Sequence, residues 1–277
     1  MGKFDNCILA CDIDGTLVAN GYINPKNIEK IEYFMSEGGK FSVSTGRSVC
    51  AISDVLNSLK RISPSIVANG CMIYDYNIQE ILYENALPNE DHYLVEKIIR
   101  SGIKVGVEVH CGPSAFTVNR TDLVTEHHIY EKYESLDMSF KEVTLKKWHK
   151  VICMLDSVED RIKLREYILK DNKSNCDFVD TCAMINGKLR NYFEIVPKGV
   201  SKASSLIKLC ELMNIKKGGL FAIGDYYNDV QMLKLADVSA VPCDSPEDIK
   251  SLANYITNTC ENGAVADFID YLDKLMQ

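Results

Sequence analysis

Short apolar runs alternate with longer stretches of helical hydrophobic spacing at the N-terminal end of the chain. Residues 8–11 form a fully apolar run, and residues 41–44 and 65–68 form two further β-rich runs. Between the first two runs, Asn24-Pro25 introduces a segment with apolar residues at helical spacing, and Gly38-Gly39 ends it. The spacing predicts a second helix over residues 49–59. Strands separated by helices in this way are typical of an α/β fold with a parallel sheet.

The same alternation returns near the C-terminal end. Residues 203–213 and 230–235 have helical spacing, and residues 220–223 and 238–241 are apolar β-rich runs. The intervening residues 84–192 are too many for a loop and carry patterns of their own. We expect strands over residues 104–109, 115–118 and 151–155 and a helix over residues 158–169. The pattern therefore predicts one domain formed by residues 1–83 and 193–277 and a second domain inserted at residues 84–192.

Composition places the chain among ordinary globular proteins. It has 277 residues, of which 46% are hydrophobic and 25% charged, and that length allows a core domain carrying an inserted one. The formal net charge of −8 argues against nucleic acid or an anionic membrane as the main partner. Because no apolar stretch approaches the length of a membrane span and no signal-like segment opens the chain, we expect a cytoplasmic protein.

The cysteines and histidines favour neither disulfides nor zinc. The eleven cysteines are odd in number, and several, such as Cys11, Cys153 and Cys210, lie in apolar runs. They are expected to be reduced, buried thiols. No CxxC or HExxH motif occurs, and His127 and His128 are adjacent rather than spaced as a helical ligand pair. A zinc site is therefore not expected.

Polar residues follow the predicted strands. The segments are Asp12-Ile13-Asp14-Gly15-Thr16, Thr45-Gly46-Arg47, Asn69-Gly70 and Gly224-Asp225. In an open parallel sheet the ligand site lies beyond the carboxyl ends of the strands, so these segments are expected to converge in space. For Thr45 or Asn69 taken singly, a role in turns and caps alone explains the residue equally well.

The carboxylates carry more information. Asp12 and Asp14 flank one residue directly after a buried strand, and Asp225 and Asp229 add two more acids near the same sheet edge. Carboxylates that are close and poorly solvated repel one another, so a cation is expected among them. Oxygen ligands without His or Cys favour Mg²⁺ over zinc.

A phosphate dianion at such a site also requires positive charge from the protein. Lys202, beside Ser201 at the start of a predicted helix, can supply it. A lysine opposes the dipole at a helix N-terminus unless an anion lies beside it. Lys198, four residues earlier, is the alternative candidate, and we rank Lys202 ahead of it.

Taken together, these motifs closely resemble the haloacid dehalogenase superfamily of phosphohydrolases, specifically the Cof-type subfamily IIB. The resemblance spans nearly the whole chain and rests on five motifs in family order: Asp12-Ile13-Asp14-Gly15-Thr16, Ser44-Thr45-Gly46-Arg47, Val67-Ala68-Asn69-Gly70, Lys198-Gly199-Val200-Ser201-Lys202 and Gly224-Asp225-Tyr226-Tyr227-Asn228-Asp229. It implies a Rossmann-like parallel-sheet core, with residues 84–192 as an α/β cap domain.

The resemblance also implies roles for individual residues. Asp12 is expected to be the nucleophile that attacks phosphorus, and Asp14 the acid that protonates the leaving oxygen and then activates water. Asp12, Asp225 and the main-chain carbonyl of Asp14 are expected to bind Mg²⁺. The remaining assignments are Thr45, Gly46, Lys202 and Asn228 as phosphate contacts and Arg47, Asn69 and Asp229 as supporting residues.

The implied activity is a magnesium-dependent phosphatase acting on a small phosphorylated metabolite. A phosphomutase of the phosphomannomutase type is the nearest alternative, and a weakly catalytic phospho-ligand-binding regulator is another. Sugar phosphates, pyridoxal phosphate and flavin mononucleotide all stay open as substrates, as does the oligomeric state. Polar cap candidates for substrate contact are His110, Arg120 and Arg190, although each is expected to be an ordinary surface residue.

Overall fold

The computed structural model describes residues 2–59, 61–170, 172–185 and 187–276, and the chain divides into two compact units. Unit 1 comprises Met1–Arg47, Ser53–Tyr83 and Ser201–Gln277, and unit 2 comprises Ser48–Ile52 and Glu84–Val200. This division differs from the expected one at residues 48–52 and 193–200. Residues 193–197 belong to unit 2 because they are part of its long strand, and Ala51 belongs there because it packs with Ala115 and Tyr133.

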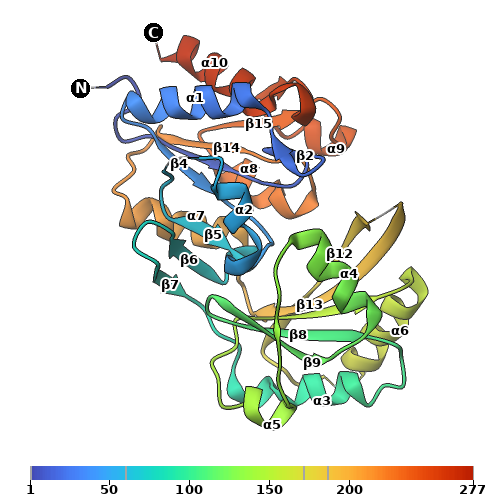
Figure 1. Cartoon of the computed structure of the whole chain (residues 1–277). Coiled ribbons are helices and arrows are strands. Elements are labelled where there is room, and N and C mark those ends of the chain that lie inside the picture. Colours follow the sequence, from blue (N-terminus) through green and yellow to red (C-terminus); the bar gives the residue numbers. More distant parts are fainter. Residues whose placement is uncertain (1, 60, 171, 186, 277) are drawn as a thin grey trace. The chain divides into compact units, whose positions relative to one another are not determined.

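A five-stranded parallel sheet forms the centre of unit 1 (Figure 1). Its strand order is β16 (Tyr255–Thr257), β15 (Val238–Pro242), β14 (Leu220–Ile223), β1 (Ile8–Cys11) and β4 (Lys40–Val43), and all neighbours are parallel. Every residue of β1 is buried, as expected for a central strand that is covered on both faces. The mixed α/β fold with a central parallel sheet predicted from the sequence is confirmed.

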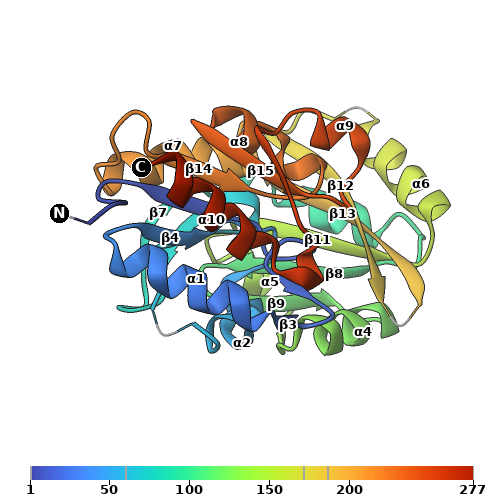
Figure 2. The same cartoon turned by 90° about the horizontal axis from the view of Figure 1, so that it is seen from above.

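Helices cover both faces of this sheet. Helix α1 (Pro25–Ser36) begins where expected, because Asn24 caps it and proline occupies its first turn. It lies beside α10 (Ala264–Leu275) on one face, as Figures 1 and 2 both show. Helices α7 (Lys202–Leu212) and α8 (Val230–Leu235) cover the other face, where their apolar residues pack against Ile8 and Ala10 of β1.

Smaller elements complete unit 1. The predicted strand at residues 65–68 is β5, which pairs antiparallel in a separate sheet and is joined to the main sheet by a bridge between Ser44 and Ile66. The predicted helix over residues 49–59 is instead two short pieces, of which η1 (Val49–Ala51) belongs to unit 2 and α2 (Ser53–Leu56) to unit 1. The remaining elements are β2 (Val18–Ala19), β3 (Tyr22–Ile23), β5 (Ser65–Val67), η2 (Ala68–Gly70), β6 (Met72–Asp75), β7 (Glu80–Glu84), η4 (Tyr227–Asp229), α9 (Glu247–Lys250) and η5 (Cys260–Asn262).

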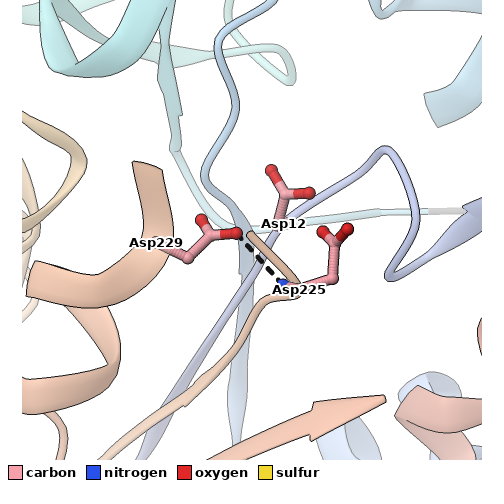
Figure 3. A group of neighbouring side chains, drawn as sticks. All are labelled: Asp12, Asp225 and Asp229. Atoms are coloured by element: carbon pink, nitrogen blue, oxygen red, sulfur yellow. Dashed lines mark hydrogen bonds between the residues drawn. The ribbon is translucent and has the colours of Figure 1, made fainter. Parts of the chain in front are cut away.

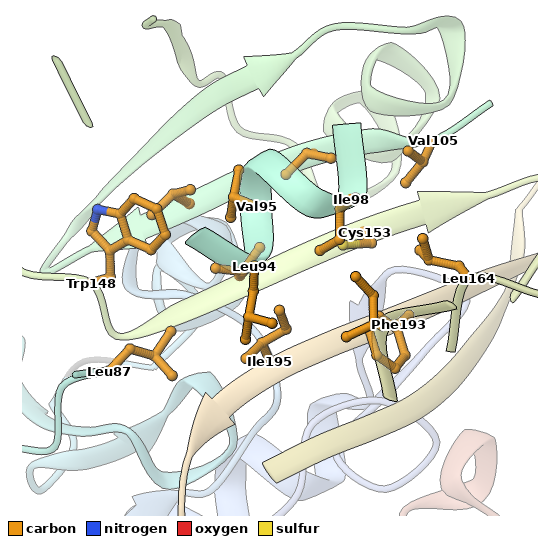
Figure 4. Close-up of a cluster of buried hydrophobic side chains, with 14 of the residues drawn as sticks. Leu87, Leu94, Val95, Ile98, Val105, Trp148, Cys153, Leu164, Phe193 and Ile195 are labelled. Carbon is orange, nitrogen blue, oxygen red and sulfur yellow. The ribbon is translucent and has the colours of Figure 1, made fainter. Parts of the chain in front are cut away.

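Unit 2 is built on a six-stranded sheet. Its order is β10 (Leu136–Asp137), β9 (Ser114–Asn119), β8 (Gly106–Cys111), β11 (Lys150–Leu155), β13 (Lys188–Pro197) and β12 (Cys176–Ile185). Alternation along β8 sends Val107 and Val109 into a large apolar cluster (Figure 4) and Glu108 and His110 to the opposite face. The other elements are η3 (Asn89–Asp91), α3 (Tyr93–Ile99), α4 (Asp122–Glu131), α5 (Phe140–Val143) and α6 (Val158–Leu169).

The apolar cluster of unit 2 joins one face of its sheet to α3 and α6. Figure 4 shows Leu94, Val95 and Ile98 of α3 against Cys153, Phe193 and Ile195 of the strands. In both units, within the described residues, no helix has the length and apolar character needed to cross a membrane.

Candidate active site

Loops that follow adjacent strands of unit 1 bring the predicted site residues together. β1 pairs in parallel with β14 on one side and β4 on the other, and Cys11 lies level with both Ile223 and Val43. The loops that begin at Asp12, Ser44 and Gly224 therefore start at the same edge of the sheet. This is the carboxyl edge, where ligands bind in open α/β sheets.

Three carboxylates meet at this edge. Asp12, Asp225 and Asp229 each offer an oxygen within 4.8 Å of the others, and Figure 3 shows the three side chains gathered. Asp12 and Asp229 are buried and Asp225 is partly buried. Asp225 accepts a hydrogen bond of 3.0 Å from the Thr16 hydroxyl, and its main-chain N–H donates to Asp229 at 3.1 Å.

The ammonium group of Lys202 lies between two of these acids. Its Nζ is 2.5 Å from Oδ1 of Asp12 and 2.7 Å from Oδ1 of Asp229, and the residue is only 2% exposed. Lys202 is the first residue of α7, which Ser201 caps through a reciprocal pair of hydrogen bonds with Ser204. The cap fixes the helix start, and the start places the ammonium against the nucleophile candidate.

The cluster has three carboxyl groups and one ammonium group, and this imbalance, together with burial, shifts the pKa values of its members. Burial raises the pKa of Asp12 well above its usual range, against the attraction of Lys202, and the other aspartates raise it further. Burial and the nearby Asp229 raise the pKa of Asp225 to about 6. Burial alone would lower the pKa of Lys202, but its attraction to Asp12 and Asp229 prevails and the pKa is raised.

The residues present fit a divalent cation. The single positive charge of the buried lysine does not balance the three carboxylates, so the group can accept a further cation. The donors are all carboxylate oxygens, which are the ligands that Mg²⁺ prefers. Asp229 already accepts bonds from Lys202 and from the Asp225 amide, so Asp12 and Asp225 are the better placed ligands. Asp229 was expected among the carboxylates at this edge in a supporting role, and its contact with Lys202 is the feature that the sequence did not indicate.

Asp14 lies apart from the acid cluster. Both of its carboxylate oxygens accept hydrogen bonds from Arg47, with Nε at 2.8 Å and Nη2 at 2.6 Å. The Asp14 side chain is 47% exposed, and that of Arg47 is 12% exposed. The next residue, Gly15, has a φ of +84°, and a Cβ there would lie 2.5 Å from Oδ2 of Asp225. Glycine at this position therefore lets the loop turn while Asp225 approaches closely.

The loops after β4 and β5 are tied to one another. The Thr45 carbonyl accepts a 3.0 Å bond from the Asn69 N–H, and the Thr45 hydroxyl accepts one of 3.1 Å from the Arg47 N–H. A Cβ at Gly46 would lie 2.8 Å from Oδ1 of Asn69, which explains why glycine stands there. Thr45 is 1% exposed, so its side chain is held in place rather than mobile.

Other predicted residues lie elsewhere. Asn228 is exposed within η4, between Asp225 and Asp229, and Lys198 is exposed in unit 2. The contrast with the buried Lys202 agrees with ranking Lys202 ahead of Lys198.

The expectation that the three cap candidates are surface residues is wrong for two of them. His110 and Arg190 are 2% and 7% exposed. Arg190 is buried because it pairs with both Glu126 and Asp156. His110 lies on the face of β8 opposite the apolar cluster, with Nε2 3.7 Å from Oε2 of the buried Glu108. Arg120 pairs with Asp137, and both side chains are exposed.

Comparison with known proteins finds relatives along nearly the whole chain. The chain is 26% identical over 263 residues to 5-amino-6-(5-phospho-D-ribitylamino)uracil phosphatase YcsE of Bacillus subtilis, covering 95% of this chain and 94% of that protein. In fold it is similar to TM0651 from Thermotoga maritima, with a TM-score of 0.82, 21% identity and coverage of 96% and 97%. It is also similar in fold to BT4131, which is described as a HAD subclass IIB sugar phosphatase, with a TM-score of 0.79, 20% identity and coverage of 96% and 99%.

The family itself is shown by a match along most of the chain. The profile that describes haloacid dehalogenase-like hydrolases matches residues 9–269, a span that includes all five motifs and both units. The chain therefore belongs to the haloacid dehalogenase-like hydrolase family, as its motifs predict.

Proposed function

We propose that this protein is a magnesium-dependent phosphatase that hydrolyses a small phosphorylated metabolite through an aspartyl-phosphate on Asp12. The observation that carries the proposal is the contact of 2.5 Å between Lys202 and Asp12 inside a group of three carboxylates. Lys202 occupies Oδ1 of Asp12, which leaves the second oxygen available for attack on phosphorus. The family match and the phosphatase among the relatives support the same activity.

Each of the chain's own residues then has a defined task. Asp12 forms a bond to phosphorus as the bond from phosphorus to the leaving oxygen breaks, and Asp14 gives that oxygen a proton. Asp14 then takes a proton from the water that cleaves the aspartyl-phosphate. Lys202 orients Asp12 and offsets the phosphate charge, while Thr45, Gly46 and Asn228 contact phosphate oxygens.

The Mg²⁺ site is proposed on Asp12, Asp225 and the main-chain carbonyl of Asp14. When bound, Mg²⁺ supplies positive charge that offsets repulsion between the Asp12 carboxylate and the phosphate. Asp229 fixes the site by holding Lys202 and the Asp225 amide. Asn69 and Arg47 support the loop that contains Thr45, because the main-chain N–H of each donates a hydrogen bond to Thr45.

The substrate proposed is a phosphate monoester of a small metabolite such as a sugar phosphate. YcsE is named for a phosphorylated ribityl compound, and BT4131 is described as a sugar phosphatase. We propose unit 1 as the catalytic core and unit 2 as the cap. We also propose a cytoplasmic location, which is supported by eleven cysteines that are all free thiols.

Phosphate release tests this proposal. The wild type is incubated with a panel of metabolite phosphates and with p-nitrophenyl phosphate, with Mg²⁺ or with excess chelator. We expect release of inorganic phosphate that stops on chelation, returns with Mg²⁺ and is absent in a folded Asp12→Asn variant. Release of inorganic phosphate also distinguishes a phosphatase from a phosphomutase, which keeps phosphate on the sugar. Near-wild-type release by Asp12→Asn would falsify the proposal.

A further inference from the structure

Arg47 and Asp14 form a paired contact that the proposed reaction does not use. Both residues belong to unit 1, on the loops that follow the adjacent strands β4 and β1. The guanidinium donates through Nε to Oδ2 and through Nη2 to Oδ1 of Asp14, at 2.8 and 2.6 Å. Two parallel bonds of this kind are the geometry in which arginine recognises carboxylates and phosphates most strongly. Both Asp14 oxygens are therefore occupied by one partner.

This contact conflicts with the chemistry assigned to Asp14. An acid that protonates a leaving oxygen needs one carboxyl oxygen directed at that atom. In the observed arrangement, the Asp14 carboxylate faces Arg47 and stands apart from Asp12, Asp225 and Asp229. Asp14 must leave Arg47, at least in part, before it can act.

The surroundings allow such a release. The Arg47 main chain is held on both sides, since its N–H donates to the Thr45 hydroxyl at 3.1 Å and its carbonyl accepts from the Ala68 N–H at 2.8 Å. The loop itself is therefore fixed, so an exchange of partners needs movement of the Arg47 side chain alone. The Asp14 side chain is 47% exposed, so water can solvate its carboxylate once the pair opens.

We propose that Arg47 is a positioning residue that exchanges partners when substrate binds. Before substrate binds, Arg47 pairs with Asp14. The incoming phosphate then binds the guanidinium in place of Asp14, and Asp14 is free to protonate the leaving oxygen. Thr45, two residues before Arg47, is the proposed phosphate contact on the same loop, which places Arg47 within reach. A phosphate dianion is the stronger competitor because it offers more charge and the same paired geometry. This inference rests on the proposed phosphatase activity.

The exchange makes two predictions for Arg47→Ala that differ from those of a fixed support. Phosphate loses a charged partner, so binding of inorganic phosphate in the presence of Mg²⁺ should weaken by about 10- to 100-fold. Asp14 stays available to protonate the leaving oxygen. The rate of phosphoryl transfer should therefore depend on the acidity of the leaving group as weakly as in the wild type. If Arg47 instead had to hold Asp14 during the reaction, Arg47→Ala would show the steep dependence expected of Asp14→Asn.

The experiment combines calorimetric titration with inorganic phosphate and kcat/KM for a series of aryl phosphates of graded leaving-group acidity. The proteins are wild type, Arg47→Ala, Arg47→Lys and Asp14→Asn. The Lys30→Gln variant is the matched control, because it removes another ion pair of unit 1, with Asp270 at 2.5 Å. Arg47→Lys keeps the charge without the paired geometry and should fall between wild type and Arg47→Ala in phosphate binding. Thermal unfolding checks that each variant is folded.

Each outcome bears on one proposal. Unchanged phosphate affinity in Arg47→Ala, or a leaving-group dependence as steep as that of Asp14→Asn, overturns the exchange while leaving the phosphatase intact. Wild-type protein that hydrolyses no aryl phosphate, or Asp12→Asn that hydrolyses them normally, overturns the phosphatase itself. Weakened binding with a shallow dependence supports the exchange.

Discussion

At the scale of single residues, Lys202 determines how Asp12 can react. A buried lysine with two carboxylate partners at 2.5 and 2.7 Å is fully compensated, and its removal leaves uncompensated buried charge. In the proposed reaction the same contact orients Asp12, because Lys202 holds its Oδ1. Stability and reactivity at this site therefore depend on the same two hydrogen bonds.

Replacing Asp14 should affect the two steps of the proposed reaction, phosphoryl transfer to Asp12 and its hydrolysis, to different extents. With an activated aryl phosphate the leaving oxygen needs little protonation, so Asp14→Asn should still transfer phosphate to Asp12. Hydrolysis then lacks its base, and turnover should fall by about 10²–10⁴-fold while the phosphoenzyme accumulates. Rapid mixing should reveal a burst of aryl alcohol equal to the enzyme, with one phosphoryl group added in intact-protein mass under acid quench. Wild-type turnover in Asp14→Asn, or label that persists when Asp12 is also replaced by Asn, would contradict these roles.

The positions of the carboxylates along the sheet edge were predictable from the sequence, whereas the directions of their side chains were not. The parallel strands β1, β4 and β14 made convergence of their following loops a geometric necessity, and Asp12 and Asp225 do meet. The direction of each side chain depends on the loop backbone, which no hydrophobic pattern encodes. Gly15 with its positive φ is one such turn. The pairing of Asp14 with Arg47 was therefore not predictable from spacing.

At the scale of elements, the 3-10 turn η2 joins the loop that contains Thr45 to helix α7, which carries Lys202. Ala68, Asn69 and Gly70 all have positive φ, at 51°, 58° and 101°. This left-handed run is costly for residues other than glycine. It brings Gly70 so close to α7 that its carbonyl accepts a 2.5 Å bond from the Ser205 hydroxyl. The turn thus fixes the start of α7 against the loop containing Thr45.

Gly70→Ala should therefore disturb both stability and catalysis. Its Cβ would lie 2.2 Å from the Ser201 carbonyl oxygen, so the backbone at the start of α7 must move. Gly218→Ala is the matched control, since Gly218 also has a positive φ, of 87°, but nothing lies within 4 Å of its Cβ. The control should cost about 1 kcal/mol from backbone strain alone. Gly70→Ala should cost more and lose most activity through misplaced Lys202, as measured by urea unfolding and phosphate release. Equal stabilities and activities for the two variants would contradict this.

Several elements were predicted with their observed bounds, whereas the helical spacing at residues 49–59 was misleading. The predicted bounds of α6 (Val158–Leu169) and β14 (Leu220–Ile223) agree with the structure. Strand β12 was missed because it lies at the sheet edge, where many of its residues are exposed and Asp177 and Asp180 interrupt the apolar pattern. Edge strands need only one partner and one covered face, so their sequences carry a weaker signal.

At the scale of the whole molecule, the histidines are divided unequally between the two units. All five histidines, namely His92, His110, His127, His128 and His149, lie in unit 2. Burial lowers the pKa of His92, His127 and His149. Trp148, the single tryptophan of the chain, also lies in unit 2, where it stacks on His92 with ring centroids 3.6 Å apart. Tryptophan fluorescence therefore reports on the unit that holds the acid-sensitive groups.

Unit 2 should lose stability as the pH falls below about 6.5, the ordinary histidine value. His127 is 2% exposed, and burial lowers its pKa to about 3 despite the attraction of Glu108. The unfolded chain therefore takes up a proton that folded His127 does not, so the stabilising contribution is complete above pH 6.5 and is lost toward pH 3. The cost from His127 is about 1.4 kcal/mol per pH unit, which amounts to about 2 kcal/mol at pH 5.

Urea unfolding followed by Trp148 fluorescence at pH 7, 6 and 5 measures this loss. His127→Phe should flatten the pH dependence by nearly one proton, because phenylalanine does not titrate. Tyr192→Phe is the matched control, since it removes the 3.2 Å contact between the Tyr192 hydroxyl and Nδ1 of His127 but keeps the imidazole. That control should lower stability by about 1 kcal/mol at every pH without changing the slope. A slope in His127→Phe equal to that of the wild type would mean that buried His127 is not the group that makes unit 2 acid-sensitive.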